Sequence, residues 1–153
     1  MGAASLIATA VGIFLIVLAA YVLVGGIVTS AEMVSAAQKT LSEREAARIH
    51  TVVEIINGTV VSTSRLAFIE VKNTGSETIT DIDDMEVYLM QDSAPVFYSN
   101  VSGDWTCTIR PDRINPKILD PDEVMNISVT YIGPDPAWAK VVTPNGVYDS
   151  AYL

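Results

Sequence analysis

The hydrophobic pattern divides the chain into two parts of opposite character. Residues 2–31 contain no Asp, Glu, Lys, Arg or His, and most of residues 6–28 are apolar. A run of that length is enough to cross the hydrocarbon core of a bilayer as one helix. The remaining chain is polar and acidic. The pattern therefore predicts a transmembrane anchor over residues 1–31 and a polar part that works at a membrane surface.

Two processed leaders are the alternatives to a retained anchor. A secretory signal peptide has a basic start and an apolar core of roughly 7–15 residues. Here the first five residues carry no Lys or Arg, and the apolar run is about twice as long as such a core. A pilin-like leader would need a basic residue before Gly2, and there is none. We therefore expect the apolar segment to be retained.

Residues 32–49 predict a helical stalk that continues the anchor. Good helix formers dominate this segment, and neither Pro nor Gly interrupts it. Its apolar stripe consists of Val34, Leu41 and Ile49 with alanines between them. That stripe is too thin to predict a stable coiled coil.

From His50 onward the period of the pattern changes to two, which is typical of β-strands. The clearest case is residues 66–72, where Ala67, Ile69 and Val71 form an apolar face. Asn57 and Gly58 predict a hairpin turn. Strands are expected over residues 50–56, 60–62, 66–72, 79–82, 85–90, 105–109, 124–132, 139–143 and 147–152. The predicted fold class is α+β: an N-terminal helix followed by an immunoglobulin-like β-sandwich over residues 50–153.

The formal net charge of −9 argues against several classes of partner. Acidic and basic residues balance within residues 32–49, so the head holds the remaining fifteen carboxylates against six basic side chains. Such a surface repels phosphate backbones and anionic lipids, which excludes nucleic acid as a partner. A cationic or cation-bridged protein partner, a high-salt environment or simple solubility each fits the charge.

The side chains that most enzymes need are scarce. His50 is the one histidine, so a blue-copper site, a histidine zinc site and a Ser-His-Asp triad find no support. Cys107 is the one cysteine and is expected to be a buried small hydrophobe. Residues 81–84 hold three aspartates that suit Ca²⁺, yet they lack a loop pattern and predict an acidic turn. We predict no enzyme, no cofactor and no metal site.

Three sequons bear on the side of the membrane that the head occupies. Asn57, Asn100 and Asn126 each begin an Asn-X-Ser/Thr triplet, a possible site of N-glycosylation outside the cytoplasm. The basic residues after the span favour the opposite orientation by the positive-inside rule. We give more weight to the sequons, the acidity and the uncharged N-terminal flank, and expect the head outside.

A stripe of small residues marks a possible helix-packing face in the anchor. Small side chains four residues apart let two helices approach closely within lipid. The residues of this predicted face are Ala4, Ala8, Gly12 and Ala20.

Three segments carry a resemblance to a known family. They read RIHTVVEI (48–55), FIEVKNTGSETITDIDDMEVYL (68–89) and ILDPDEVMNISV (118–129). Together with the anchor and the predicted sandwich, they resemble the FlaF (ArlF) family of archaellum accessory proteins, which is related to FlaG and to archaellins. The absence of a basic residue before Gly2 departs from archaellins and agrees with FlaF-type members.

The resemblance implies a structural role in motility. The helix would lie in the cytoplasmic membrane beside the archaellum motor complex. The head would bind the surface (S-) layer from the pseudoperiplasm as a stator, with a FlaG-type accessory protein as partner and as a homodimer or higher oligomer. One alternative is a filament-forming archaellin- or pilin-like subunit. The other is a membrane-tethered module for a ligand or glycan, for which Trp105 and Trp138 are the candidate exposed aromatics.

Overall fold

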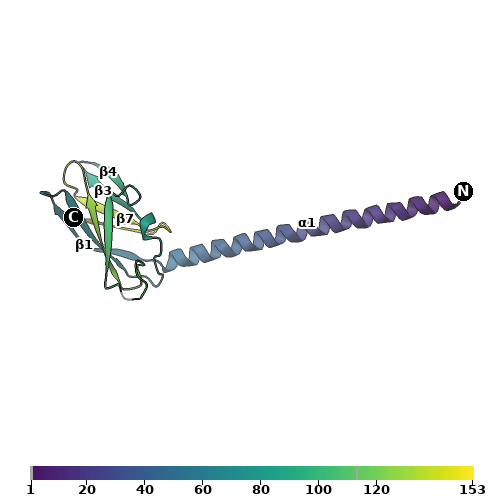
Figure 1. Cartoon of the computed structure of the whole chain (residues 1–153), viewed down its shortest axis with the longest axis horizontal. Helices are drawn as coiled ribbons and strands as arrows, with labels where there is room; N and C mark the ends of the chain where they lie inside the picture. The colour runs from purple at the N-terminus through teal and green to yellow at the C-terminus, as the bar shows by residue number, and fades with distance from the viewer. Residues whose placement is uncertain (1, 113) are drawn as a thin grey trace. The chain divides into compact units, whose positions relative to one another are not determined.

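The computed structural model describes residues 2–112 and 114–153 and contains one long helix followed by β-strands. The helix α1 spans Gly2–His50, and a short 3-10 helix spans Ile82–Asp84. The strands are β1 (Val53–Val61), β2 (Leu66–Asn73), β3 (Glu86–Gln91), β4 (Ala94–Ser99), β5 (Trp105–Arg110), β6 (Val124–Thr130), β7 (Trp138–Val142) and β8 (Tyr148–Tyr152) (Figure 1). Residues Arg44–Leu153 form one compact unit, the head.

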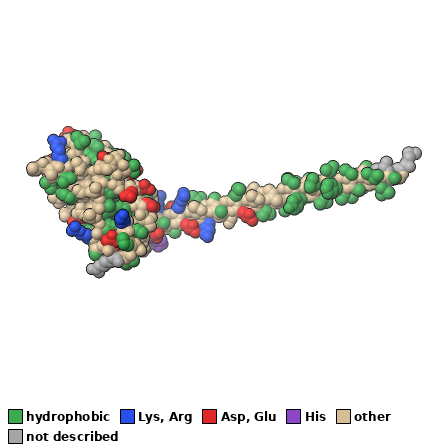
Figure 2. Space-filling model, in the orientation of Figure 1, with side chains coloured by type: hydrophobic (Ala, Val, Ile, Leu, Met, Phe, Trp, Pro, Cys, Tyr) green, Lys and Arg blue, Asp and Glu red, His purple; other side chains and the backbone are tan. Residues whose placement is uncertain are grey.

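Helix α1 runs without a break through the predicted anchor and stalk. Hydrophobic side chains cover its N-terminal part, and charged side chains appear only toward its C-terminal part (Figure 2). Its apolar segment is exposed to the surroundings, with Leu6 at 72% and Val22 at 65%. By length and composition it is the one helix among the described residues able to cross a membrane. Such exposure is expected of side chains that face lipid instead of water.

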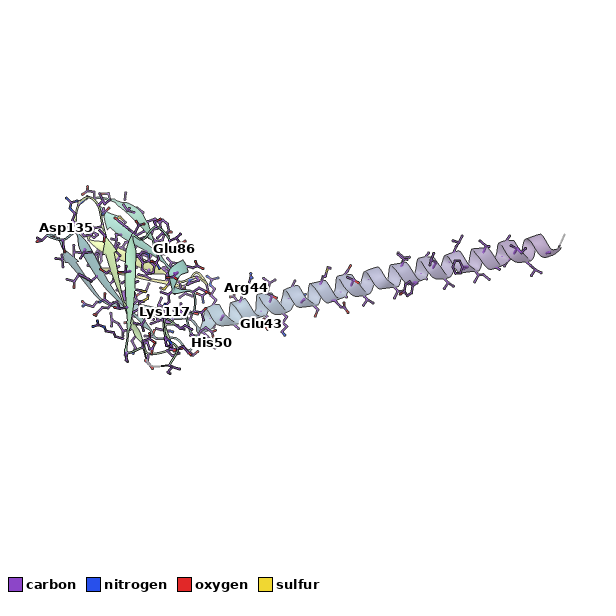
Figure 3. All side chains as sticks on the ribbon, in the orientation of Figure 1. Glu43, Arg44, His50, Glu86, Lys117 and Asp135 are labelled. Atoms are coloured by element: carbon purple, nitrogen blue, oxygen red, sulfur yellow. The ribbon has the colours of Figure 1, made fainter. Side chains whose placement is uncertain are left out.

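The head is a sandwich of two four-stranded antiparallel sheets. One sheet has the order β1-β2-β6-β5 and the other the order β4-β3-β7-β8. The outer strands β1 and β8 lie close together, and Asp149 on β8 accepts a hydrogen bond from the Ile55 amide on β1 at 2.7 Å. His50 and Asp135 lie at opposite ends of this head (Figure 3). The predicted fold class is therefore confirmed.

The alternating pattern correctly identified the core face of the first sheet. Ala67, Ile69 and Val71 on β2 are fully buried. They pair in register with Val129, Ile127 and Met125 on β6, which are also fully buried. Two strands thus present one continuous apolar face, because successive side chains of a strand point to opposite sides of the sheet.

The prediction of a hairpin turn at Asn57-Gly58 was wrong. Both residues lie inside β1, where the pairing with β2 shifts register between Ile55 and Asn57. The turn instead follows Val61, and Arg65 closes it with a left-handed backbone (φ 56°). A β-bulge accommodates one extra residue in β1. Pairing with β2 can therefore continue past Asn57 and Gly58, and the chain does not turn there.

Two further strand expectations also need correction. Residues 79–82 are not a strand, because Ile79 pairs only with Leu119 and Ile82 opens the 3-10 helix. Both isoleucines are buried at a spacing of three, which suits a 3-10 turn better than a strand. Strand β4 was missed because it contains Pro95, and proline is tolerated in a sheet only at an edge such as this one. Cys107 is half-buried, since β5 is also an edge strand.

Candidate functional site at the helix–head junction

The last carbonyl group of α1 and that of Val52, two residues beyond it, are bound by a turn that follows β2. The carbonyl of His50 accepts hydrogen bonds from the amides of Ser76 (3.0 Å) and Glu77 (3.2 Å). The carbonyl of Val52 accepts from the amides of Thr74 (2.9 Å) and Gly75 (3.0 Å). Carbonyls at the end of a helix have no partner within the helix. The turn at residues 74–77 therefore supplies partners where the chain leaves α1.

Asn73 holds this turn in place from inside the head. Its side chain is fully buried, and its Nδ2 donates to the carbonyls of Glu77 (2.8 Å) and Leu119 (3.0 Å). Its Oδ1 accepts from the amide of Gly75 (3.0 Å). A buried amide side chain is tolerated only when it is hydrogen-bonded, and Asn73 meets that condition.

Gly75 is required by the closeness of the turn to the helix end. A Cβ at this position would lie 2.4 Å from the His50 carbonyl oxygen and 2.5 Å from the Val52 amide nitrogen. Both neighbours are backbone atoms, so a side chain at position 75 would push the turn away from the helix. A glycine is thus the residue type that permits the contact.

A second segment, residues 119–123, completes the arrangement. Leu119 and Ile79 exchange two backbone hydrogen bonds (3.0 and 3.1 Å). The Asn73 backbone bonds to those of Asp122 (2.8 Å) and Glu123 (3.1 Å). Residues 73–77 and 119–123, with residues 50–52, are called the junction network below. They come from the three sequence segments that carry the family resemblance.

An ion pair and a third loop reinforce the same end of the head. Lys72 Nζ lies 2.9 Å from Asp122 Oδ1, and this hydrogen-bonded ammonium group lowers the pKa of the Asp122 carboxyl. Asn145, in the loop between β7 and β8, donates to Thr51 Oγ1 at 2.7 Å. Thr51 Oγ1 in turn donates to the Ala47 carbonyl of α1 at 2.8 Å. The end of α1 is therefore bonded to loops from both sheets.

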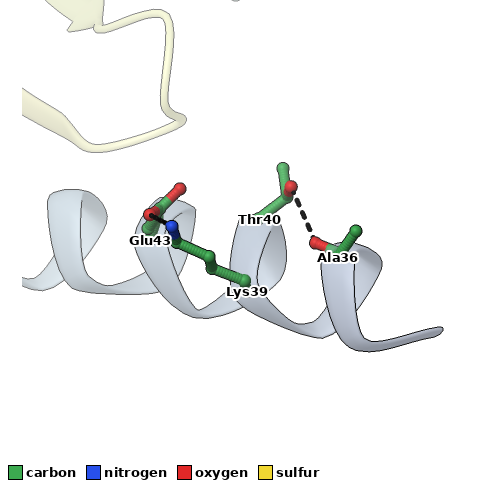
Figure 4. Close-up of polar contacts among 4 residues, drawn as sticks. All are labelled: Ala36, Lys39, Thr40 and Glu43. Carbon is green, nitrogen blue, oxygen red and sulfur yellow. Dashed lines mark hydrogen bonds and ion pairs between the residues drawn. The ribbon is translucent and has the colours of Figure 1, made fainter. Parts of the chain in front are cut away.

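Two local side-chain contacts support the stalk part of α1. Thr40 Oγ1 donates to the Ala36 carbonyl at 3.1 Å, and Lys39 Nζ lies 3.8 Å from Glu43 Oε1 (Figure 4). Both partners of the ion pair are exposed, so it contributes at most about 0.5 kcal/mol. The boundaries at residues 31 and 49 stay predictions.

The predicted glycosylation sites do not come together. Asn57 is exposed on β1, and Asn126 is half-buried in the middle of β6. Asn100 is half-buried between β4 and β5, and its Nδ2 donates to Asp83 Oδ1. Glycosylation of all three stays a prediction.

The predicted packing face lies along α1. Ala8 and Ala20 are exposed and Gly12 is half-exposed, and a side chain at position 12 would point into open space. The Ala4 side chain lies outside the described residues. The face therefore stays a prediction too.

Neither acidic nor thiol chemistry gathers into a reactive site. Among the described residues, no group of three His, Cys, Asp or Glu is placed to hold a metal ion. Burial, with a smaller effect from the Asp83 charge, raises the pKa of the Cys107 thiol, which disfavours the reactive thiolate. The junction network is a set of hydrogen bonds that holds loops of the head against the end of α1, and its role is structural. Its residues lie in the three segments that carry the family resemblance, but the sequence pattern did not predict that these segments meet at the end of α1.

Comparison with known proteins agrees with this architecture. The chain matches the archaeal-type flagellin family over residues 2–152 and belongs to that family. The archaellum periplasmic stator protein FlaG from Sulfolobus acidocaldarius is 25% identical, with a TM-score of 0.50, and the match covers 67% of this chain and 99% of FlaG. The complex of FlaF and FlaG from the same organism gives 22% identity and a TM-score of 0.49, with 66% and 87% covered. A comparison with curated proteins found no match. The predicted resemblance to an archaellum accessory protein is confirmed at the level of the family.

Proposed function

We propose that this protein is a membrane-anchored stator of the archaellum. In this proposal α1 lies in the cytoplasmic membrane beside the motor complex, and the head lies outside and binds the S-layer. A FlaG-type protein is the accessory partner. The likeness of the sandwich to a protein described as a periplasmic stator supports this function. The observation that carries it is the junction network.

A stator must transmit torque between its two attachment points without yielding between them. A flexible linker between helix and head would turn freely and carry no torque. Here the chain passes from α1 to β1 through residues 51 and 52, and both have hydrogen bonds to other loops. Hydrogen bonding of this kind where the chain leaves α1 supports a role in bearing load.

The end of the head that carries Asp135 is the proposed S-layer contact. It lies opposite the helix end, as Figure 3 shows with Asp135 and His50. Ile132 precedes Asp135 in the loop between β6 and β7 and is 83% exposed. An exposed isoleucine at this end suits contact with another protein.

A filament subunit is the second candidate, because the matched family is that of archaeal-type flagellins. In that case the apolar part of α1 would pack with other copies in the fibre core instead of lipid. The two functions differ in where the native chain is found and in whether its start has been trimmed.

The first test is the intact mass of the native protein in membrane and sheared-filament fractions. A full-length chain, or one that lacks only Met1, in the membrane fraction supports the stator. A trimmed chain recovered from filaments overturns it and favours the fibre subunit.

The S-layer contact needs its own test. We expect the purified full-length protein to sediment with isolated S-layer, and Ile132→Glu to reduce the bound fraction at least fivefold. Ile114, which is 74% exposed in the loop before the junction network, offers a matched control as Ile114→Glu. Equal effects of the two variants, or no sedimentation of the unaltered protein, would contradict S-layer binding by this end.

A further inference from the structure

Strand β5 is the edge of the sandwich that the described residues leave open for pairing. The outer strands are β1 and β5 in one sheet and β4 and β8 in the other. Strands β1 and β8 lie against each other, and Asp149 on β8 already bonds to the Ile55 amide of β1. Strand β4 contains Pro95, which has no amide hydrogen to donate. Strand β5 has no proline, and its described backbone hydrogen bonds join it to β6 alone.

Open space borders β5 on both sides. On the outer face of the sheet, Thr106, Cys107 and Thr108 line a hollow of about 370 Å³. The same three residues, with Ile109, also line a second hollow of about 660 Å³, which residues 80–84 line as well. An exposed strand edge offers unpaired N–H and C=O groups to an extended chain. Because the hollows flank β5, such a chain can reach its backbone and add a strand to the sheet.

The two hollows differ in charge. Glu70 and Arg110 balance each other in the smaller one. Four aspartates line the larger one, and Lys117 is the basic residue that lines it among those described. The larger hollow is called the acidic groove below. Its four aspartates, all of them exposed, are Asp81, Asp83, Asp84 and Asp112.

The described contacts of these aspartates leave their negative charge in place. The Thr80 hydroxyl donates to Asp81, and the Lys117 backbone amide donates to Asp112. Neither donor is charged, and no ion pair among the described residues involves the four aspartates. Their carboxylates are also not gathered around one point, since no group of three is placed to hold a metal ion there. Charge spread in this way along a strand edge suits several basic side chains of one partner.

We propose that β5 and the acidic groove bind an extended segment of another protein with Lys or Arg at every second position. Successive side chains of an added strand point to opposite faces of the sheet. Side chains beside Cys107 and Ile109, which face the core, enter the acidic groove. Long basic side chains suit this place, because their stems contact these two residues while their charged ends reach the carboxylates. Side chains beside Thr106 and Thr108 lie on the outer face and are expected to be polar.

A second copy of this chain does not fit as the occupant. In its sequence no two basic residues lie two positions apart. Two β5 edges side by side would also bring two acidic grooves together, and like charges repel. The partner is therefore a different protein that carries the alternating basic segment. Binding at β5 does not depend on the S-layer contact near Asp135 and applies equally to a stator and to a filament subunit.

Peptide binding to the full-length protein in a nonionic detergent tests the proposal. The probe is a fluorescent peptide of alternating Lys and Thr, about eight residues long to cover β5. The control peptide has the same composition, with its lysines contiguous. From fluorescence anisotropy we expect the alternating peptide to bind about tenfold more tightly, because contiguous lysines cannot all face the groove.

Paired variants locate the bound peptide. Asp84→Asn combined with Asp112→Asn should weaken binding about fivefold, because two ion pairs are lost. Asparagine keeps an oxygen that accepts the hydrogen bond of the Lys117 amide, so this turn is retained. The matched control combines Glu54→Gln with Asp92→Asn, which removes the same charge from exposed residues outside both hollows. The control should change the affinity by less than about twofold.

N-methylation of the peptide separates strand addition from attraction between charges. In an added strand, the amides of every second residue point toward β5. Methylating the amides of all Lys residues, or of all Thr residues, blocks one of the two sets. We expect one methylated peptide to bind about tenfold more weakly than the other, because the lost hydrogen bonds fall in that peptide alone.

Each comparison has a result that would overturn the proposal. No binding, or equal binding of the alternating and contiguous peptides, would exclude a register of basic side chains along β5. Equal losses in the two pairs of variants would place the peptide outside the acidic groove. Equal binding of the two methylated peptides would exclude pairing with the β5 backbone. None of these results changes the sedimentation with S-layer, so the two proposals stand or fall separately.

Discussion

Replacing Asn73 by alanine is the most direct test of the junction network. The side chain is fully buried and makes three hydrogen bonds, two to carbonyls and one from the Gly75 amide. The Gly75 amide also bonds to Val52, and the Leu119 carbonyl also accepts from Ile79. Of the three groups, the Glu77 carbonyl therefore loses the most hydrogen bonding on substitution.

The structure sets the expected size of the effect. Each hydrogen bond contributes about 1 kcal/mol, and the two groups that keep a second partner lose less than that. The space left by the amide adds a smaller penalty. We expect Asn73→Ala to lower the free energy of unfolding of the head by about 2.5 kcal/mol. For a unit of roughly 110 residues, Arg44–Leu153, this corresponds to a fall in melting temperature of about 10 °C.

Thermal unfolding of the full chain in detergent measures this effect. Trp105 is 1% exposed in the core, so its fluorescence reports the loss of head packing. Asn57→Ala serves as a control, because that asparagine is exposed on β1. A melting temperature for Asn73→Ala within about 2 °C of that of the control would refute the assigned role of the network.

Three further predictions concern other parts of the chain. Gly75→Ala should displace the turn from the helix end, because its Cβ would lie 2.4 Å from the His50 carbonyl oxygen, and faster amide hydrogen exchange at Ser76 would show this. Gly12→Ile should reduce helix association in the membrane without changing the head's melting temperature, and unchanged helix crosslinking would count against the packing face. Hydrogen bonds from the hydroxyl groups of Ser62 and Tyr131 lower the pKa of Asp135, so the stability they provide is present above about pH 4 and is lost as the pH falls through the pKa of the folded state. Below pH 4, Asp135→Asn should therefore show a weaker fall in melting temperature than the unaltered chain, and parallel curves would exclude this contribution.

The elements that sequence patterns predicted correctly are those in which the pattern is long and one-sided. The run of apolar residues in α1 and the alternation in β2 and β6 each reflect a single environment along the element: lipid-like along the helix, core on one face of each strand. A period of two or an unbroken apolar run identifies such elements because every residue adds the same evidence.

The errors fall where distant contacts outweigh a local signal. Asn57-Gly58 is a strong turn signal by itself, but pairing with β2 keeps it within β1. Ile79 looks like a strand residue, but its partner Leu119 lies forty positions later and fixes a single bridge. Pro95 disfavours a strand because it has no amide N–H to donate, but β4 is an edge strand, where one amide can remain unpaired with a neighbouring strand.

The candidate site shows the same division. The sequence alone determined a long apolar helix, an acidic β-rich head, the lack of the several histidines that common catalytic sites need, and the segments that resemble a family. Only the tertiary structure showed that residues 73–77 and 119–123 meet at the end of α1. Composition and periodicity describe neighbours in the chain, whereas the junction network depends on strand order and register. Those are set by the packing of the whole sandwich, which no local pattern contains.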